Sequence, residues 1–160
     1  MAISSGKRFE ECFRNSIPED IFFYRFKDGT ASWNPNGFTR FQAKNICDCF
    51  VWDGETLFFL ELKSHKGKSL PLNCIRQNQV EELTDASNYA NTVCGLLIFF
   101  SDIDRCFFLD IKKYNEFVKT NDRLSIPLVF LEQNGIEIGI EKKKINFTVK
   151  IDSFLKERKI

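Results

Sequence analysis

Two carboxylates and one lysine lie on either side of a predicted β-turn in the first half of the chain. Asp48 lies in one run of β-branched and aromatic residues (46–52), and Glu61 and Lys63 lie in a second such run (57–63). The Asp-Gly between the two runs is the strongest short-range signal for a β-hairpin. Because charged side chains are depleted in strands this apolar, these three need a functional or electrostatic explanation.

The alternation of side chains along a strand predicts where these three lie relative to one another. Glu61 and Lys63 are two residues apart and therefore share one face. A two-residue loop at 53–54 places Asp48 diagonal to Glu61, and a four-residue loop at 53–56 places it directly opposite. Either loop brings the three side chains to one face, whereas a loop of odd length would separate Asp48 from the other two.

Two carboxylates held this close favour a bound divalent cation. At about 4 Å they repel by roughly 4 kcal/mol at an effective dielectric near 20, and a cation or a proton between them removes this repulsion. Oxygen ligands of this kind suit Mg²⁺ or Mn²⁺. A lysine beside them can orient a water molecule or neutralise charge that develops on a phosphate. The alternative is an ion pair between Asp48 and Lys63 on an edge strand, which would add little stability.

Two further polar residues are predicted to lie on the apolar faces of helices. A helix over about 4–16 places Glu10 on its apolar stripe, either as a site residue or as a stripe-edge side chain that reaches solvent. A second helix, over 73–90 with Asn73 as its N-cap, places Gln79 at the centre of the stripe. An amide there is buried or faces a site, and in both cases it needs hydrogen-bond partners.

The composition indicates a single cytoplasmic domain with a packed core. The 160 residues include 18 Phe, far too apolar a composition for a disordered chain. No apolar run approaches the roughly 18 residues of a membrane span, and the N-terminus lacks the apolar region of a signal peptide, so no membrane association is expected. Six cysteines without a Cys-x-x-Cys pair, and a single histidine, indicate buried reduced thiols rather than a zinc site.

Basic residues gather near the carboxylates and in one long connecting segment, although the net charge is only +1. The segment 27–45 is too long for a tight turn and interleaves aromatic with basic residues, which suits stacking on bases and contact with phosphates. The alternative is a loop that its aromatic side chains pin to the core. A further basic run, 142–144, is interpreted as a solvated surface. The candidate DNA-binding residues are Arg8, Arg40, Lys44, Lys66, Lys68 and Arg76.

The expected elements define an α/β fold in which a mixed central β-sheet is flanked by helices. The carboxylates are expected near the ends of two central strands, and the segment 64–73 is expected to be a loop. Besides the two helices and the hairpin, the pattern predicts strands at 21–26, 92–101 and 105–109, a helix after Asp110, a strand pair within 136–149 and a closing helix at 151–159.

The same residues resemble the core of the PD-(D/E)xK nucleases and, more narrowly, the RecU-type Holliday junction resolvases of Gram-positive bacteria and their phages. The resemblance covers about 6–155 and is most specific in the middle of the chain. The matching features are Gly6 and Glu10 in the first helix, Asp48, the run Glu61-Leu62-Lys63, and Pro71-Leu72 before a helix that carries Gln79.

This resemblance implies a restriction-endonuclease-like core and a homodimeric, magnesium-dependent endonuclease, in which Mn²⁺ can substitute. Such an enzyme nicks two opposed strands of branched DNA, a four-way junction, and needs no small-molecule cofactor. Asp48 and Glu61 would bind the metal together with the Leu62 carbonyl, and Lys63 would position the attacking water. Glu10 and Gln79 would complete the site.

Three departures from that family pattern are present. Cys47 stands where these resolvases usually have threonine, so a hydroxyl contact to metal or substrate is lost, and the long basic N-terminal arm is missing. The segment 27–45 does not match the projecting stalk in sequence, which makes junction specificity less secure than nuclease chemistry. The alternatives are a repair or restriction-like nuclease of the same superfamily and a catalytically silent binding module. The intact carboxylates and lysine argue against the silent module.

Overall fold

The computed structural model describes residues 4–27 and 44–157, and its centre is a six-stranded mixed β-sheet. Strands β3 and β5 run parallel, and every other neighbouring pair of the sheet is antiparallel. β3 and β5 also lie in the middle of the sheet, as expected for strands that are buried on both faces. In spatial order the strands are β1 (Phe22–Arg25), β2 (Cys49–Trp52), β3 (Leu57–His65), β5 (Thr92–Phe100), β6 (Arg105–Asp110) and β8 (Ile136–Ile138).

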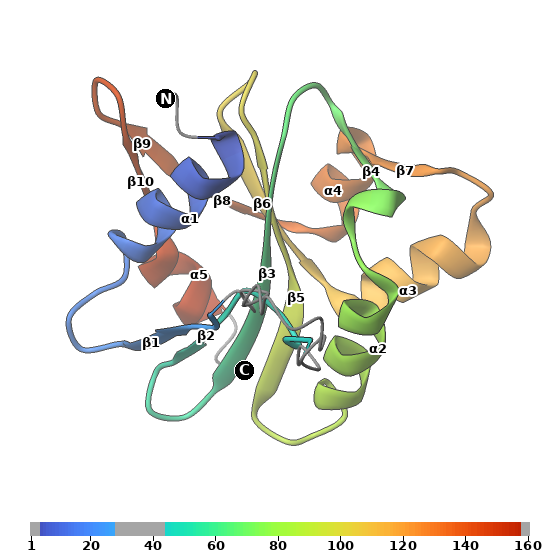
Figure 1. Ribbon diagram of the computed structural model, residues 1–160, viewed down its shortest axis with the longest axis horizontal. Coiled ribbons are helices and arrows are strands. Elements are labelled where there is room, and N and C mark those ends of the chain that lie inside the picture. The colour runs from blue at the N-terminus through green and yellow to red at the C-terminus, as the bar shows by residue number, and fades with distance from the viewer. Residues whose placement is uncertain (1–3, 28–43, 158–160) are drawn as a thin grey trace, which may run out of the picture.

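Helices cover both faces of this sheet, as predicted (Figure 1). One face carries α1 (Ser5–Arg14), α5 (Ile151–Glu157) and a hairpin of β9 (Ile140–Lys142) and β10 (Phe147–Val149). The opposite face carries α2 (Gln77–Ala86), α3 (Ile111–Thr120), α4 (Leu128–Asn134) and a small sheet of β4 (Ser69–Pro71) and β7 (Ser125–Pro127). A 3₁₀ turn, η1 (Leu72–Cys74), joins β4 to α2.

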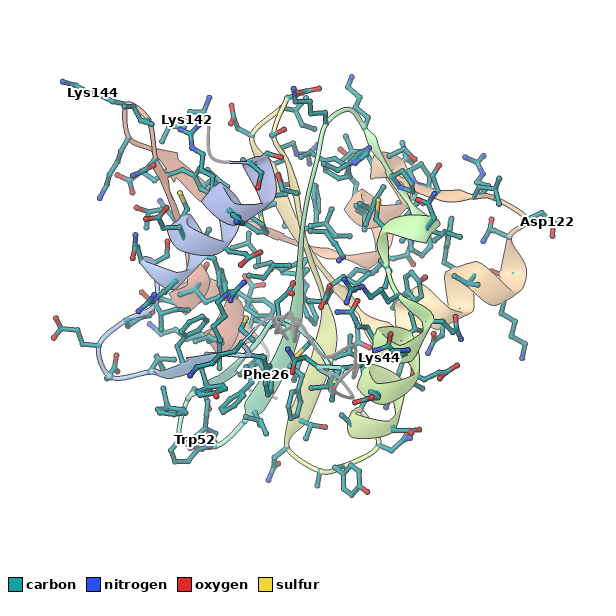
Figure 2. The ribbon with its side chains drawn as sticks, in the orientation of Figure 1. Phe26, Lys44, Trp52, Asp122, Lys142 and Lys144 are labelled. Atoms are coloured by element: carbon teal, nitrogen blue, oxygen red, sulfur yellow. The ribbon has the colours of Figure 1, made fainter. Side chains whose placement is uncertain are left out.

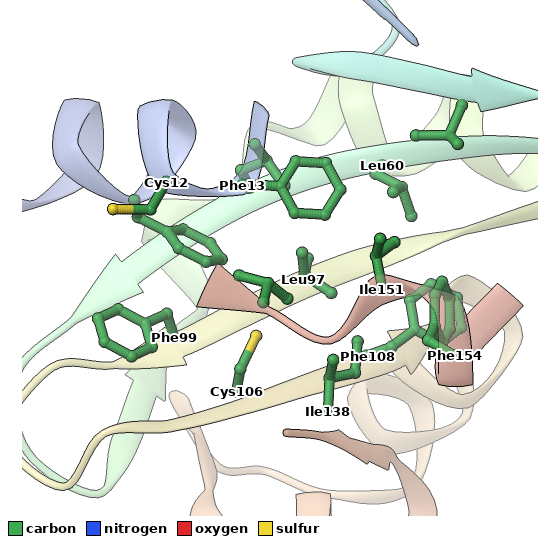
Figure 3. Packing of buried hydrophobic residues seen from close by; sticks show 14 of the residues in the cluster. Cys12, Phe13, Leu60, Leu97, Phe99, Cys106, Phe108, Ile138, Ile151 and Phe154 are labelled. Atoms are coloured by element: carbon green, nitrogen blue, oxygen red, sulfur yellow. The ribbon is translucent and has the colours of Figure 1, made fainter. Parts of the chain in front are cut away.

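Each face of the sheet has its own hydrophobic core. On the α1 face, Phe9 and Phe13 are almost fully buried, and the rings of Phe99 and Phe147 stack with centroids 4.5 Å apart. Figure 3 shows how side chains from α1, the central strands and α5 interdigitate in this core. Burial of an aromatic side chain of this size contributes roughly 1.5–3 kcal/mol, so the core holds α1 firmly against the sheet.

A four-residue loop connects β2 to β3. Cys49 pairs with Leu60, so the residues between the strands are 53–56. The Asp53 Oδ1 atom accepts hydrogen bonds from the backbone N–H groups of Glu55 and Thr56, at 3.0 and 2.8 Å. Gly54 has a φ of +98°, a conformation that glycine adopts without steric cost. The ladder ends at Cys49 and Leu60, and one further step of the same register would place Asp48 opposite Glu61.

Several predicted elements differ from the observed ones. The segment 64–73 contains the end of β3, all of β4 and part of η1, so it is not simply a loop. Helix α2 begins at Gln77, and Asn73 is therefore not its cap. Strand β8 pairs with β6, whereas the terminal hairpin consists of β9 and β10. Strand β7 and helix α4 were not predicted. Three-residue strands such as β4 and β7 depend on a partner more than 50 residues away, which local periodicity does not reveal.

The predicted projecting segment 27–45 lies largely outside the described residues, so its role stays a prediction. Its two described ends are joined by a hydrogen bond of 2.7 Å, in which the Asn45 Nδ2 atom donates to the carbonyl of Lys27. In the part of the chain that the structure describes, no helix has both the length and the apolar composition needed to cross a membrane.

Candidate active site

Asp48 and Glu61 lie opposite each other where β2 begins beside β3. Asp48 directly precedes β2, and its Oδ2 atom accepts a 2.7 Å hydrogen bond from the backbone N–H of Leu62. Glu61 is only 1% exposed. The hydrogen bond fixes the Asp48 carboxylate against the backbone of the strand that carries Glu61. The two acidic side chains are thus held together by hairpin geometry.

Two donors from different elements hold the Glu61 carboxylate in place. The Lys63 Nζ atom lies 2.6 Å from Oε1, and the Gln79 Nε2 atom donates to Oε2 at 2.7 Å. Gln79 belongs to the first turn of α2 and is itself buried, with 6% exposure. Its own Oε1 atom accepts a 3.4 Å hydrogen bond from the backbone N–H of Arg76, which orients the amide. Lys63 therefore pairs with Glu61 rather than with Asp48.

The electrostatics of the carboxylate pair favour the uptake of positive charge. Burial, then the charge of Glu61 and to a smaller extent that of Glu10, raise the pKa of Asp48 from 3.8 to about 7. The Leu62 N–H and the charge of Lys63 oppose this shift but do not cancel it. The Asp48 carboxyl therefore keeps its proton to a higher pH than an ordinary aspartate does, and a cation bound between the two carboxylates would replace that proton.

The cysteines that flank Asp48 are protonated thiols. The Cys47 Sγ atom donates to the carbonyl of Cys49 at 3.1 Å. Burial, followed by the charges of Glu61 and Asp48, raises the pKa of Cys47, and burial raises that of Cys49. A metal ligand would have to be a thiolate. Over residues 4–27 and 44–157 no three His, Cys, Asp or Glu side chains group together as a metal site. The side-chain donors for a cation at this place are therefore Asp48 and Glu61.

Glu10 lies beside this pair, on α1, and is held by an arginine that the sequence analysis did not single out. The Arg25 Nε and Nη2 atoms lie 2.9 and 2.7 Å from the Glu10 Oε2 atom. The Glu10 side chain is 24% exposed, so it is neither in the core nor fully solvated. The signal that could have revealed Arg25 is a charged residue within the apolar strand 21–26. The structure thus brings together all five predicted catalytic residues, and their roles stay predictions.

Four of the six predicted DNA-binding residues form two groups on the surface. Lys44 and Arg76 line a hollow of about 680 Å³ at the start of α2, the helix that carries Gln79. Arg8 and Lys66 line a cavity of about 540 Å³ at the other end of β3. Lys68 is exposed and lines neither hollow, and Arg40 lies outside the described residues. Arg76 directly precedes the helix whose Gln79 binds Glu61, so the first group lies on the side of the carboxylates. The second group lies beyond the end of β3, the strand that carries Glu61.

Comparison with known proteins connects this arrangement to DNA recombination. Residues 18–153 match the family of Recombination protein U, RecU. The SPbeta prophage-derived uncharacterized protein YotM of Bacillus subtilis (strain 168) is 30% identical over 163 residues, which cover 92% of this chain and 83% of that protein. Among solved structures, Hjc, a Holliday junction resolvase from the archaeal hyperthermophile Archaeoglobus fulgidus, superposes with a TM-score of 0.55. That match covers 82% of this chain and 95% of Hjc at 14% identity, which shows a shared fold and confirms the predicted architecture.

Proposed function

Since the chain belongs to the RecU family, we propose that it is a magnesium-dependent endonuclease that cuts four-way DNA junctions. The observation that carries this proposal is the buried pair of Asp48 and Glu61, with Lys63 and Gln79 bound to the second carboxylate. A silent binding module would have no need for two adjacent carboxylates whose mutual repulsion raises the pKa of one of them. A hydrolase that binds a divalent cation needs such a pair.

The donor set fits Mg²⁺. Asp48 and Glu61 supply oxygen ligands from one or two carboxylates, which is the usual protein contribution to a Mg²⁺ site, and the Leu62 carbonyl is a further candidate. Mn²⁺ prefers the same ligands. A carboxylate has about four lone-pair positions, so the hydrogen bonds of Glu61 to Lys63 and Gln79 leave it able to bind a cation. When bound, the cation would polarise the phosphate and lower the pKa of a water molecule.

The residues of this chain would perform the remaining tasks. An ammonium group has three donors, so Lys63 can hold Glu61 and also orient the attacking water or the phosphate oxygens. Gln79 would fix the orientation of Glu61 from α2. Glu10, held by Arg25, would lie near the attacking water and adds negative charge beside Asp48. Lys44 and Arg76 would contact the phosphates next to the cleaved one.

The family and the fold support the junction as substrate. The chain belongs to the family of a recombination protein, and Hjc, whose fold it shares, is a Holliday junction resolvase. Resolution of a junction requires cuts in two opposed strands. Among the described residues of one chain, Glu61 is the single buried carboxylate, so one chain supplies one such pair and we expect a two-fold symmetric homodimer. Light scattering that shows only monomers, both alone and on junction DNA, would contradict paired cleavage.

A comparison of substrates tests the proposal. The full chain is incubated with a four-way junction, a flap, a linear duplex and a single strand of matched sequence, with Mg²⁺ and with EDTA. We expect symmetric nicks in the junction only when Mg²⁺ is present, and none from the Glu61→Gln variant. Faster cleavage of the flap or the duplex would identify a repair or restriction-like nuclease instead. Absence of cleavage on all four substrates, with Mg²⁺ or Mn²⁺, would overturn the nuclease assignment.

A further inference from the structure

The hairpin of β9 and β10 forms one wall of a basic cavity, here called the hairpin groove. The cavity measures about 540 Å³ and lies between this hairpin, the N-terminal turn of α1 and the turns that follow β3 and β5. Figure 2 shows Lys144 at the outer end of the hairpin and Lys142 beside α1. The basic residues that line the groove are Arg8, Lys66, Lys142, Lys143 and Lys144.

The positive charge of the hairpin groove is mostly uncompensated. Among the described residues, Asp104 is the one carboxylate that lines it, and its Oδ2 atom lies 2.5 Å from Lys142 Nζ. Within residues 4–27 and 44–157, no ion pair joins a carboxylate to any of the other four cationic side chains, Arg8, Lys66, Lys143 and Lys144. Four like charges around one cavity repel each other, and a polyanion relieves that repulsion. The groove is therefore suited to a chain of phosphates.

Packed aromatic rings form the base of the groove. Phe99 from β5 and Phe147 from β10 line it, and their rings stack at 4.5 Å. Phe9 of α1 stacks on Phe99 in turn, with centroids 5.3 Å apart. The hairpin and the helix thus pack on the central sheet through these rings. A hairpin backbone held in this way loses less conformational freedom when it binds a ligand.

The groove lies beyond the end of β3, the strand that carries Glu61. Lys66 directly follows this strand and is five residues from Glu61, so its backbone lies at most about 17 Å away at the rise of a β-strand. B-DNA rises by 3.4 Å per nucleotide of one strand, so the same length spans about five base pairs. We propose that the hairpin groove binds the sugar–phosphate backbone of a junction arm about five base pairs from the cleaved phosphate. This inference rests on the proposed nuclease function and gives the β9–β10 hairpin a role in it.

The salt dependence of DNA binding tests this site. The variant Lys143→Gln/Lys144→Gln is compared with Lys112→Gln/Lys113→Gln, which removes the same charge from α3 on the opposite side of the sheet. Junction affinity is measured without Mg²⁺ at several salt concentrations. Each lost phosphate contact lowers the slope of log K against log[salt] by about 0.9, so the groove variant should lose about 1.8 and bind at least about tenfold more weakly at 0.1 M salt. The α3 variant should match wild type.

Neutral methylphosphonate linkages locate the contact. Placed four to six nucleotides from the cut, they should weaken binding of wild type more than binding of the groove variant, because the variant has already lost the contacts of Lys143 and Lys144. Equal salt slopes for the two double variants would overturn the proposed role of the groove. Equal losses of affinity from the neutral linkages in wild type and in the groove variant would do the same. In both cases, junction cleavage by wild type would still support the nuclease function. Absence of both DNA binding and cleavage by wild type would overturn the two proposals together.

Discussion

Two clusters in this molecule contain the same charges and behave in opposite ways. At the candidate site two carboxylates, Asp48 and Glu61, lie near one cation, Lys63, which pairs with Glu61. At the far edge of the sheet two carboxylates share Arg105. Glu137 binds its Nε and Nη2 atoms, each at 2.7 Å, and Glu132 lies 2.5 Å from its Nη1 atom. Both clusters therefore have two negative charges and one positive charge.

Solvent access and hydrogen-bond geometry separate the two clusters. Glu61 is 1% exposed, whereas the Glu137 side chain is 49% exposed. Burial and the neighbouring charge raise the pKa of Asp48 to about 7, but hydrogen bonds from Arg105 lower the pKa of Glu137. In the exposed cluster the Arg105 guanidinium binds both oxygens of Glu137, and water screens the charge of Glu132. The lysine of the buried cluster binds one oxygen of Glu61 only. The buried cluster is therefore the one whose repulsion a bound cation would relieve.

Neutralisation of one carboxylate in each cluster should produce the largest contrast. Asp48→Asn or Glu61→Gln should reduce junction cleavage at least about 1,000-fold, since a cation site contributes several kcal/mol to the transition state. Junction affinity should change little, because it depends on lysines and arginines. Glu137→Gln should cleave like wild type. Single-turnover rates and Mg²⁺-free binding of the same three variants give the measurement. Cleavage by the Asp48 or Glu61 variant at near wild-type rate would contradict the assignment of this pair.

The two clusters should also respond to pH with opposite signs. Asp48 ionises at about pH 3.8 in the unfolded chain and near 7 in the folded one, so the folded state binds more protons between these values. Metal-free stability should fall as pH rises through this window and then level off. The loss should amount to a few kcal/mol, at about 1.4 kcal/mol for each pH unit between the two pKa values.

Denaturant unfolding at pH 4 to 8 measures this effect. The Asp48→Asn variant should lack this pH-dependent loss, and Mg²⁺ should stabilise wild type at pH 8 but not the variant. The lowered pKa of Glu137 has the opposite consequence, because its contribution is present above pH 4.5 and is lost as the pH falls below it. Identical pH profiles for wild type and Asp48→Asn would show that Asp48 is not under electrostatic strain.

The candidate site was more predictable from the sequence than its surroundings were. Strand alternation and an even hairpin loop are local properties, and they predicted that Asp48, Glu61 and Lys63 share a face. Helical periodicity predicted that Gln79 is buried or faces a site, and it is 6% exposed and donates to Glu61. The sequence left open which hairpin loop forms, because this depends on the two hydrogen bonds that Asp53 accepts inside the turn.

Long-range pairings account for most of what the sequence did not reveal. Arg25 meets Glu10 through the packing of α1 against the edge of the sheet. Strand β8 joins β6 rather than the neighbouring strand in sequence. The basic run 142–144 has the composition of an ordinary solvated surface, and only the fold brings Arg8 and Lys66 next to it. Such contacts depend on tertiary packing and leave no local period.

Two glutamines on α2 sharpen the contrast between buried and exposed hydrogen bonds. Gln79→Ala removes the donor to Glu61 Oε2 and leaves a buried carboxylate oxygen without this partner, which should cost about 1–3 kcal/mol of stability. Cleavage should fall about 10- to 100-fold and require more Mg²⁺, as is usual when a partner of a metal ligand is lost. Gln77 donates to Glu81 at 3.0 Å on the exposed side of the same helix. Gln77→Ala should leave cleavage and its Mg²⁺ dependence unchanged, and equal effects of the two substitutions would remove Gln79 from the site.

The ion pair of Glu10 and Arg25 is more exposed than Glu61 and less exposed than Glu137. Its variants should have the smallest effects on cleavage and stability. A half-exposed ion pair contributes at most about 1 kcal/mol, and Glu10→Gln should cost no more than that in stability. Because the charge of Glu10 raises the pKa of Asp48, its removal should move the acid limb of the cleavage pH profile to lower pH. We expect a rate loss of about tenfold or less.

If Arg25 acts by positioning Glu10, Arg25→Met should give a similar loss and the double variant no further one, because coupled residues are not additive. A pH profile that Glu10→Gln does not move, with rate losses that simply multiply in the double variant, would assign the pair to the protein surface.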